Sequence, residues 1–480
     1  MSEHCGFIVK ITELHPHSNA DRLQCATIFG QNVIVDLNTK LDDWGVFFPT
    51  DLQLSQEYCE YNNLVRKKDE NGNNIGGYLD PEKRNVRAMK LRGERSEGLF
   101  MPLSSLEYTG VTKFEIGNQI DILNGHEICR KYIPRGHHRN PDSVKGNKGR
   151  KTKVDIAPLF AQHVDTEQLA YHLKDFKPGD LIEITLKIHG TSQRTGYLPK
   201  LVDMKPKNLL GKWGKAWGEG SNKLRNKLYN YYLDTATPVY EYGYITGTRR
   251  TVLDNFEKGG YYGGNKFREP HAKAFEGKLF KGETVYYEVA GFTETGASIM
   301  PQVANSKISD KEFTKKYGPT TTFSYGCAPD GKQMFYGRDD DGDFAIEQKV
   351  PQSRLFVYRM TMTGEDGHVV EYPPDYMRYR CEQMGIECVP VLWQGYLEQV
   401  SEDYPVGEFA KFMAEQFYDG PDPIGKTHVR EGVVVRIVNK PKFCAYKHKN
   451  FNFKCLSGVA VDSLAEKDIE NMDEDILSEM

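Results

Sequence analysis

The stretch Ile182-Glu-Ile-Thr-Leu-Lys187-Ile-His189-Gly190-Thr191-Ser192-Gln-Arg194 decides how the chain is interpreted. Residues 181–186 form an apolar run rich in β-branched side chains, which predicts a buried strand. A lysine follows the strand at once, and a turn-forming glycine comes three residues later. A lysine in this position can present a desolvated amine, which is a nucleophile in covalent catalysis. Lys187 is therefore the first candidate catalytic residue.

Three later stretches add charged residues to predicted strands. They are Val285-Tyr-Tyr-Glu288-Val-Ala-Gly291, Glu431-Gly-Val-Val-Val-Arg436 and Cys444-Ala-Tyr-Lys447-His-Lys449-Asn450. Alternation along the last strand places both lysines on one face, where two ammonium groups can hold a triphosphate. Taken singly, the carboxylates could equally form salt bridges at strand ends, and the lysines could be a solvated sheet edge.

The order of these segments resembles motifs I, III, IV and V of the covalent nucleotidyltransferases, a superfamily of RNA ligases, DNA ligases and mRNA capping enzymes. The K-x-H-G, E-x-A-G and K-x-K-N forms look most like ATP-dependent RNA ligases of the nick-sealing type. The strand Arg354-Leu-Phe-Val-Tyr358-Arg-Met resembles motif IIIa, and Gly247-Thr-Arg-Arg250-Thr resembles the arginine segment after motif I. The resemblance spans about residues 180–455.

The resemblance implies a covalent lysyl-AMP on Lys187 and transfer of AMP to a 5′-phosphate RNA end. A 3′-OH then attacks that end and expels AMP, so that a nick is sealed, as in RNA repair. The implied cofactors are ATP and a divalent metal, Mg²⁺ or Mn²⁺, with Glu288 and Glu431 as the metal residues. The full set implied to bind the nucleotide is Lys187, Gly190, Arg194, Arg250, Glu288, Tyr358, Glu431, Lys447 and Lys449.

Two of these choices have close competitors. Arg249 competes with its neighbour Arg250 as a phosphate clamp. Tyr358 is expected to stack on adenine, with Phe356 as second candidate on the expectation that only one of them faces the pocket. Leu186, directly before the lysine, has no polar side chain, so the contact to the base must come from elsewhere.

Residues 1–130 are predicted to be a separate β-rich module. Short runs at Phe7–Ile11, Gln31–Asp36 and Gly45–Pro49 are separated by turn formers. Residues 15–23 and 86–99 resemble the OB-fold module of tRNA-binding proteins, and such barrels bind oligonucleotides across one face. A barrel that only docks on its neighbour is the alternative.

The expected fold class is α+β: the OB-type barrel, then a mixed α/β nucleotidyltransferase domain with antiparallel sheets over residues 155–460. A basic linker over 131–154 and an acidic tail over 461–480 complete the chain. Strands are predicted at Leu181–Leu186, Val285–Val289, Leu355–Met360 and Val433–Val438. Helices are predicted at Glu167–Phe176, Asn222–Leu233 and Pro374–Met384.

Composition limits the classes of protein that fit. The 480 residues carry 63 Lys+Arg and 67 Asp+Glu, a net charge of −4, and no apolar run approaches the ~20 residues of a membrane span. The nine cysteines form no CxxC pair and no secretory signal is recognisable, so a reducing, cytoplasmic location is expected. The expected partner is RNA, as a nicked duplex or an RNA–DNA hybrid, and the protein is expected to be a monomer.

Several alternatives stay open. The chain could be a DNA ligase, a capping-type guanylyltransferase or a non-catalytic RNA-binding scaffold; capping is disfavoured because only about 25 residues follow motif V. An insert at 205–227 interleaves lysines with Trp213 and Trp217, which suits nucleic-acid binding or anchoring to the core. The run Arg338–Asp343 lacks the calcium-loop pattern and predicts a hairpin turn. His137 and His138 are assigned to the linker.

Overall fold

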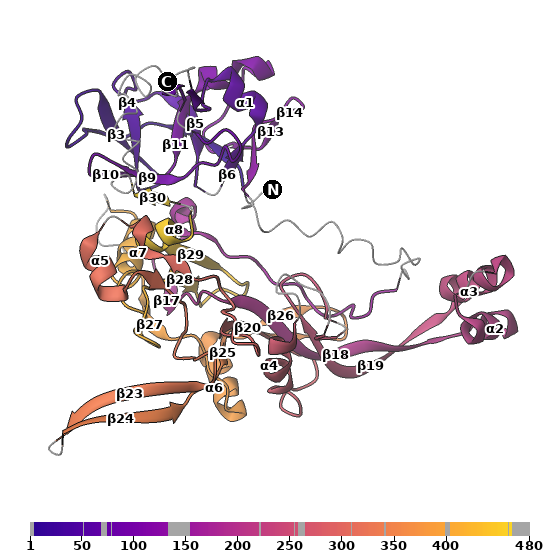
Figure 1. Cartoon of the computed structure of the whole chain (residues 1–480). Coiled ribbons are helices and arrows are strands. Elements are labelled where there is room, and N and C mark those ends of the chain that lie inside the picture. Colours follow the sequence, from indigo (N-terminus) through magenta and orange to yellow (C-terminus); the bar gives the residue numbers. More distant parts are fainter. Residues whose placement is uncertain are drawn as a thin grey trace.

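The computed structural model describes residues 4–50, 52–68, 74–77, 79–132, 154–219, 222–253, 255–257, 265–308, 310–339, 342–398, 404–458 and 460–462. Figure 1 shows the N-terminal 130 residues as one mass of short strands beside a larger part that carries two long extensions. The expected linker lies almost wholly outside the described residues, as do His137, His138 and most of the acidic tail.

The N-terminal part is built from small antiparallel sheets. A four-stranded sheet has the order β11–β5–β1–β12 and a three-stranded sheet the order β2–β3–β4. Their bounds are β1 Gly6–Lys10, β2 Leu14–Pro16, β3 Leu23–Ile28, β4 Gln31–Asp36, β5 Trp44–Phe48, β11 Leu99–Pro102 and β12 Gln119–Ile120. The three strands predicted from the sequence are present to within one residue at each end. No closed barrel is found among the described residues, so the OB fold is not confirmed.

Shorter elements complete this part, whose buried apolar residues form separate clusters, one with Ile8 and Phe48 and another with Val9 and Phe47. The helix α1 (Gln56–Tyr61) begins after Ser55, whose side chain accepts from the backbone N–H of Tyr58. The remaining strands are β6 Leu52–Leu54, β7 Lys67–Lys68, β8 Asn74–Gly76, β9 Ala88–Leu91, β10 Glu94–Ser96, β13 Ile122–Leu123, β14 His126–Glu127 and β15 Cys129–Lys131.

The end of the described chain returns to the N-terminal part. Strand β30 (Ala460–Asp462) pairs in parallel with β9, with Ala460 opposite Ala88. Close by, Lys454 forms an ion pair with Glu97, and the guanidinium of Arg95 lies 4.3 Å from the ring centre of Phe451. The first residues of the predicted acidic tail are thus a strand.

Two five-stranded sheets form the larger part. The first has the order β16–β29–β28–β17–β27 and the second β19–β18–β20–β25–β26. The first comprises β16 Glu167–Gln168, β17 Leu181–Leu186, β27 Val391–Tyr396, β28 Gly432–Ile437 and β29 Ala445–Lys449. The second comprises β18 Thr191–Lys205, β19 Thr237–Gly247, β20 Glu283–Gly291, β25 Ser353–Thr363 and β26 Val369–Glu371. All pairings are antiparallel except β16 with β29. The predicted mixed α/β part with antiparallel sheets is confirmed.

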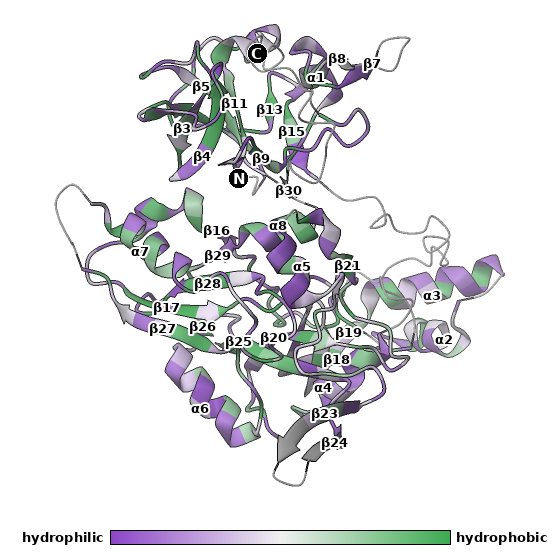
Figure 2. Cartoon of the chain, turned by 60° about the vertical axis from the view of Figure 1, so that its left-hand side comes forward, coloured by the Kyte–Doolittle hydropathy of each residue, from purple (hydrophilic) through white to green (hydrophobic). Residues whose placement is uncertain are grey.

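Alternation explains which faces of these strands are buried. In β20 and β25, Val285, Tyr287 and Val357 pack into one core cluster on one face of the second sheet. Ile182, Ile184 and Val433 form a separate core under the first sheet. Figure 2 shows the apolar residues concentrated along these central strands, whereas helix α6 is mainly hydrophilic. The opposite faces of the two sheets are therefore available to line a polar site.

Two of the three predicted helices are present. Helix α6 spans Pro374–Met384 and α3 spans Lys223–Thr235, with Asn222 as its N-cap. The helix predicted over Glu167–Phe176 is wrong: this segment is β16 followed by 3₁₀ turns at Leu169–Tyr171 and Leu173–Asp175. Tertiary contacts override its apolar spacing, because Glu167 pairs with Tyr446 in the sheet and the Tyr446 hydroxyl donates to Asp175.

The other elements are short or project from the body. They are α2 Leu209–Trp217, α4 Glu269–Lys273, α5 Lys311–Tyr317, α7 Val406–Glu415, α8 Phe451–Leu456, β21 Val303–Ala304, β22 Thr320–Thr321, β23 Lys332–Asp339 and β24 Gly342–Lys349. Strands β23 and β24 pair with Asp339 opposite Gly342, which agrees with the predicted hairpin turn. Within the described ranges, no helix is both long and apolar enough to span a membrane.

Candidate active site

The segment Lys187–Gly190 is where the chain crosses from one five-stranded sheet to the other. Strand β17 of the first sheet ends at Leu186, and β18 of the second begins at Thr191. A Cβ on Gly190 would lie 2.4 Å from the carbonyl oxygen of Val289 and 3.0 Å from Cγ of Glu288. Only glycine allows this approach, and the crossover therefore brings Lys187 close to β20.

Three adjacent strands of the first sheet bring charged residues together. The Lys187 N–H donates to the carbonyl of Gly432 at 3.1 Å, which sets the end of β17 against the start of β28. Gly432 in turn pairs with Lys449 of β29, with a φ of 143° that favours glycine. Register alone thus places Lys187, Glu431 and Lys449 side by side.

Glu431 is the centre of this cluster. Its Oε1 lies 2.9 Å from Nζ of Lys187 and 3.4 Å from Nζ of Lys449, and its side chain is 2% exposed. Burial opposes ionisation of Glu431, but the two lysine charges outweigh it and hold the pKa of its carboxyl well below the usual range. The site therefore holds a carboxylate between two cations.

His189 lies beside Glu431 and is the fourth residue of this cluster. Its Nδ1 lies 3.6 Å from Oε2 of Glu431, and its ring meets Phe323 and Phe453 edge-on. Its backbone N–H donates to the Tyr325 hydroxyl at 2.6 Å. Burial lowers the pKa of His189, with Glu431 acting in the opposite direction. The imidazole is thus a buried and firmly held part of the crossover.

Glu288 faces the same space from the second sheet. It lies opposite Ser192 of β18 and Phe356 of β25, and its side chain is partly buried. Burial raises the pKa of Glu288 to about 7, although Lys187 and Arg249 act against the rise. A carboxyl with a raised pKa facing a cavity is typical of functional sites.

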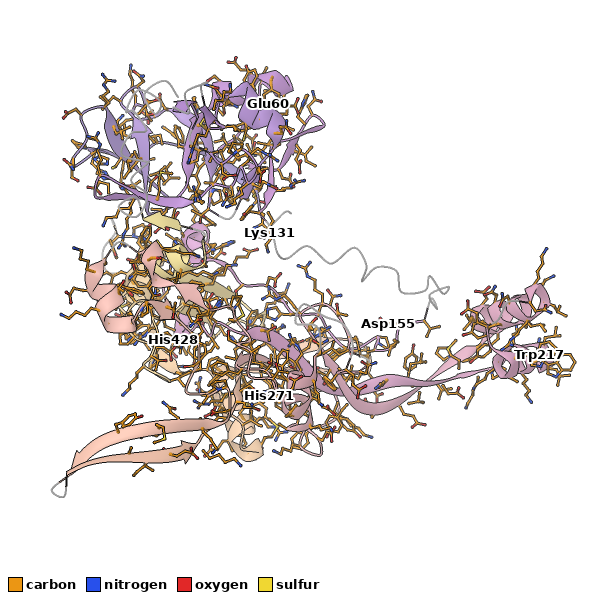
Figure 3. The ribbon with its side chains drawn as sticks, in the orientation of Figure 1. Glu60, Lys131, Asp155, Trp217, His271 and His428 are labelled. Atoms are coloured by element: carbon orange, nitrogen blue, oxygen red, sulfur yellow. The ribbon has the colours of Figure 1, made fainter. Side chains whose placement is uncertain are left out.

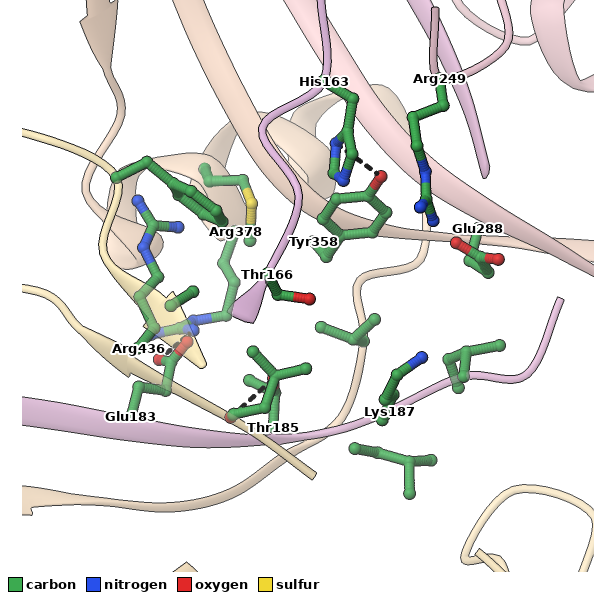
Figure 4. Close-up of a pocket in the computed structure, with 17 residues that line it drawn as sticks. His163, Thr166, Glu183, Thr185, Lys187, Arg249, Glu288, Tyr358, Arg378 and Arg436 are labelled. Carbon is green, nitrogen blue, oxygen red and sulfur yellow. Dashed lines mark hydrogen bonds and ion pairs between the residues drawn. The ribbon is translucent and has the colours of Figure 1, made fainter. Parts of the chain in front are cut away.

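The two sheets enclose a cavity, shown in Figure 4, with the nucleophile candidate at one end. Around Lys187 and Glu288 its wall is formed by His163, Arg249 and Tyr358. Toward the other end, alternation along β17 presents Thr185 and Glu183 on the same face as Lys187. The cavity thus runs along the strand that delivers the lysine.

The far end of the cavity is a polar group of charges. Glu183 is 3% exposed and accepts from Arg378 of α6 at 2.5 Å. Arg436 of β28 lies next to them, with its guanidinium 5.1 Å from the ring centre of Phe443. This end offers both hydrogen-bond donors and an acceptor to a bound group.

Tyr358 lies on the cavity wall, whereas Phe356 does not. The Tyr358 hydroxyl lies 3.0 Å from Oγ of Ser192 and 3.4 Å from Nδ1 of His163. Burial lowers the pKa of His163 to about 4, so the imidazole is neutral near pH 7. Phe356 is 2% exposed and packs in a core cluster with Leu186. The pairing of β25 with β20 is interrupted between these positions, so a bulge rather than simple alternation separates the two rings.

Two predicted arginines lie away from the cavity lining. The Arg194 guanidinium, 2% exposed, donates to the carbonyls of Phe160 and Ala161 and covers the Phe160 ring at 4.1 Å. Arg250 is largely exposed and pairs with Asp165. Arg249, which also pairs with Asp165, is the arginine that lines the cavity. Arg249 rather than Arg250 therefore lies at the cavity, and Arg194 holds backbone carbonyls instead of facing it.

The last predicted residue, Lys447, lies on β29 in register with Gln168 and Val434. It is two residues from Lys449, as the alternation requires, and neither lysine is among the residues that line the cavity. Sequence reasoning missed Glu183, Thr185, Arg378 and Arg436. Strand alternation places Thr185 and Glu183 on the same face as Lys187, so these two could have been predicted. No sequence pattern relates Arg378 of α6 to β17.

No protein-family model matches this sequence, and no curated protein matches it. Solved structures do. A variant of Naegleria gruberi RNA ligase with AMP and Mn is similar over 94% of this chain and 98% of that chain, with a TM-score of 0.53 and 12% identity. An apo variant gives a TM-score of 0.52 at 13% identity over 95% and 98% of the two chains. The same ligase with PPi gives 0.51 at 13% identity over 93% and 96%. The two proteins share a fold over nearly their whole length.

Proposed function

We propose that this protein is an ATP-dependent RNA ligase that joins a 3′-OH to a 5′-phosphate through a covalent lysyl-AMP and an AMP-capped RNA. The observation that carries the proposal is the position of Lys187. It ends a strand inside a cavity, 2.9 Å from Glu431 and facing Glu288, in a fold shared with an RNA ligase. The ordered sequence motifs point to the same chemistry.

In the first step the Lys187 amine attacks the α-phosphorus of ATP. A nitrogen–phosphorus bond forms and the bond to pyrophosphate breaks. The lysine ammonium loses one proton before the attack and a second as the bond forms, so the nitrogen of lysyl-AMP keeps one hydrogen. Glu431 contacts the amine directly and orients it toward the cavity. In the second step the 5′-phosphate of RNA displaces Lys187 from AMP, and in the third the 3′-OH displaces AMP. Each step is phosphoryl transfer, which depends on positioning and charge neutralisation.

The carboxylates fit a divalent metal that is completed by substrate. Glu431 Oε2 is buried without a hydrogen-bond partner among the described residues, and Glu288 lines the cavity together with Lys187, the residue that Glu431 contacts. No cluster of three ligating side chains exists within the described ranges, so phosphate oxygens and waters would supply the other ligands, as is usual for Mg²⁺. Such a metal, Mg²⁺ or Mn²⁺, neutralises charge on the phosphates when bound. The Naegleria gruberi ligase has been solved with ATP and Mn.

The remaining residues contact different parts of the nucleotide. Tyr358 stacks on adenine, and Arg249, in place of Arg250, contacts a phosphate. Lys449 and Lys447 neutralise the triphosphate from β29. Leu186 offers the base no polar side chain, so we assign base contacts to the far end of the cavity, where Glu183 and Arg378 lie.

The substrate we propose is a nicked RNA duplex or RNA–DNA hybrid, sealed by a monomer in the cytoplasm as part of RNA repair. Residues 1–130 form the RNA-binding module and residues 155–460 the nucleotidyltransferase domain. The contacts of Lys454 with Glu97 and of β30 with β9 support joint action of the two parts, because they join them directly.

The test is label transfer from α-³²P-ATP to the protein, followed on a denaturing gel. Covalent label is expected with wild type and not with Lys187→Ala. Loss of label in a variant with the wild-type circular dichroism spectrum and melting temperature assigns the nucleophile. Label retained by folded Lys187→Ala contradicts the assignment, and label from GTP alone identifies a guanylyltransferase.

A further inference from the structure

The helices α2 and α3 sit at the end of an extension, far from the active site. The long strands β18 and β19 pair from Arg194–Gly247 to Lys205–Thr237 and form its stalk. Figure 1 shows the two helices at the end of this stalk, projecting away from the body of the protein. Strand β18 begins at Thr191, so the stalk starts four residues after Lys187.

One face of α2 packs against α3 and is made of glycine. A Cβ on Gly214 would lie 2.2 Å from the carbonyl oxygen of Leu228, so the two helices touch at the backbone. Gly211, one turn earlier, is buried as well. The large apolar residues of α2 lie beside this contact, on the adjoining outer face of the helix.

That outer face is exposed. Leu209, Leu210, Trp213 and Trp217 are each between 47% and 61% exposed. Figure 3 shows Trp217 at the outer end of the extension. Anchoring of these tryptophans to the core, the alternative left open by the sequence, is excluded by this exposure. Apolar surface held in water on a separate projection marks an interaction site.

The helices are fixed to the stalk by polar contacts. Asn208 caps α2 by accepting from the N–H of Gly211, and its amide donates to the Tyr231 hydroxyl. The Tyr232 hydroxyl and the Lys215 ammonium both donate to the carbonyl of Met204 on β18. The outer face is thus held in a fixed orientation relative to β18.

The charge around this face is strongly positive. Between residues 205 and 235 the sequence has two acids, Glu219 and Asp234, and seven basic residues. The basic residues are Lys205, Lys207, Lys212, Lys215, Lys223, Arg225 and Lys227, all exposed. The chain as a whole has a net charge of −4, so this concentration of positive charge is local.

We propose that the outer face of α2, with the surrounding basic residues of α2 and α3, is a second RNA-binding site that holds the substrate at a distance from the joining centre. Trp213 and Trp217, four residues apart, stack on unpaired bases, and Lys212, Lys223 and Lys227 contact phosphates. This inference rests on the proposed function only for the identity of the substrate.

The stalk sets the distance between the two sites. The 15 residues from Thr191 to Lys205 are separated by 14 steps of roughly 3.3 Å, which allow a reach of up to about 46 Å. At the roughly 3.4 Å per base pair of B-form DNA, this length corresponds to about 14 base pairs, and the shorter rise of an A-form RNA duplex makes the number somewhat larger. An RNA whose unpaired segment begins about that far from the nick can therefore occupy both sites.

The first experiment measures binding directly and needs no ligase activity. The chain has four tryptophans, so a Trp44→Phe/Trp393→Phe background leaves fluorescence from the outer face alone. Titration with a 20-nucleotide single-stranded RNA should quench this fluorescence. In otherwise wild-type protein, Trp213→Ala/Trp217→Ala should weaken RNA binding about tenfold or more. Lys212→Ala/Lys223→Ala/Lys227→Ala should lower the slope of log affinity against log salt by about 2.

The second experiment uses substrate length as its control. Sealing of a nicked duplex with 20 base pairs and an unpaired overhang on each side should fall about tenfold in the double tryptophan variant at subsaturating RNA. Sealing of a duplex with 6 base pairs on each side, too short to reach α2, should be unchanged, as should adenylylation of Lys187. Failure of adenylylation in wild type would contradict the proposed function while leaving the binding result valid.

Other outcomes would overturn the inference. Unquenched fluorescence with RNA, or equal effects on the long and short duplexes, would refute it. Binding to phosphatidylglycerol vesicles that depends on the tryptophans, without RNA binding, would identify a membrane contact instead. A dimer that dissociates in the double variant, seen by sedimentation without an effect on RNA binding, would identify a contact between two copies.

Discussion

The sharpest test of the active-site geometry is a single methyl group at Gly190. Alanine there would place Cβ 2.4 Å from the carbonyl oxygen of Val289, where ordinary contacts begin at about 3.4 Å. The clash is with backbone of β20, which cannot rotate away. The crossover that carries Lys187 must therefore move by about 1 Å relative to the strand that carries Glu288.

The expected cost has two parts. Overpacking of this kind destabilises a protein by about 1–3 kcal/mol, which is about 2–10 °C in melting temperature for a domain of this size. Misplacement of a reacting group by 1 Å lowers its rate by roughly 10²-fold. Gly190→Ala should thus reduce single-turnover adenylylation by about 100-fold at a temperature where the variant is still folded.

Gly243 provides the matched control. It lies in β19 of the same sheet, and a Cβ there would be 3.9 Å from the nearest atom, Cβ of Lys200. Gly243→Ala should keep both the melting temperature and the rate of wild type. If Gly190→Ala does the same, the close approach of the crossover to β20 is incorrect. If it loses stability but keeps its rate, the position of Lys187 does not depend on this contact.

Two further predictions concern Glu288 and the arginines. Burial raises the pKa of Glu288 from 4.5 to about 7. As pH rises from 4.5 through 7, the free energy of unfolding of the protein without nucleotide or metal should therefore fall by on the order of 2 kcal/mol relative to that of Glu288→Gln. Melting temperatures of the two proteins that change in parallel with pH would contradict the raised pKa. Arg194→Met should destabilise by roughly 1–3 kcal/mol, since two carbonyls lose their donor, yet leave adenylylation per folded molecule near wild type. Arg249→Met should instead lower adenylylation with little change in melting temperature. Label transfer and thermal melting, measured on both variants, distinguish these two effects.

The elements predicted from the sequence are correct where the local pattern and the tertiary contacts favour the same structure. The run before Lys187 alternates and is apolar, and β17 has the predicted bounds. The proline at the start of α6 and the glycine after its end likewise mark the limits of that helix, because proline has the φ of a first helical turn and glycine readily adopts the left-handed backbone that ends it. The order of the motifs predicts that Lys187, Glu431 and Glu288 act together; in the structure Glu431 contacts Lys187, and Lys187 and Glu288 line the same cavity.

Long-range packing is what the sequence could not supply. The helix predicted over residues 167–176 fails because Glu167 pairs with Tyr446, far along the chain. Arg194 has the residue type of a phosphate ligand, and only the fold shows its guanidinium on backbone carbonyls. The far end of the cavity combines Glu183 with Arg378, and no spacing rule relates a strand to a helix that follows it at such a distance.

The pairing of β30 with β9 has a consequence for synthesis. A ribosome releases the N-terminal part of a chain first, and domains commonly fold in that order. Here Ala88 finds its neighbour only when Ala460 has been made, so one edge of β9 stays open while the intervening residues are synthesised. An open strand edge can pair with other chains. The nascent protein is therefore exposed to aggregation until its last segment emerges, and shortening the chain before residue 460 would make that exposure permanent.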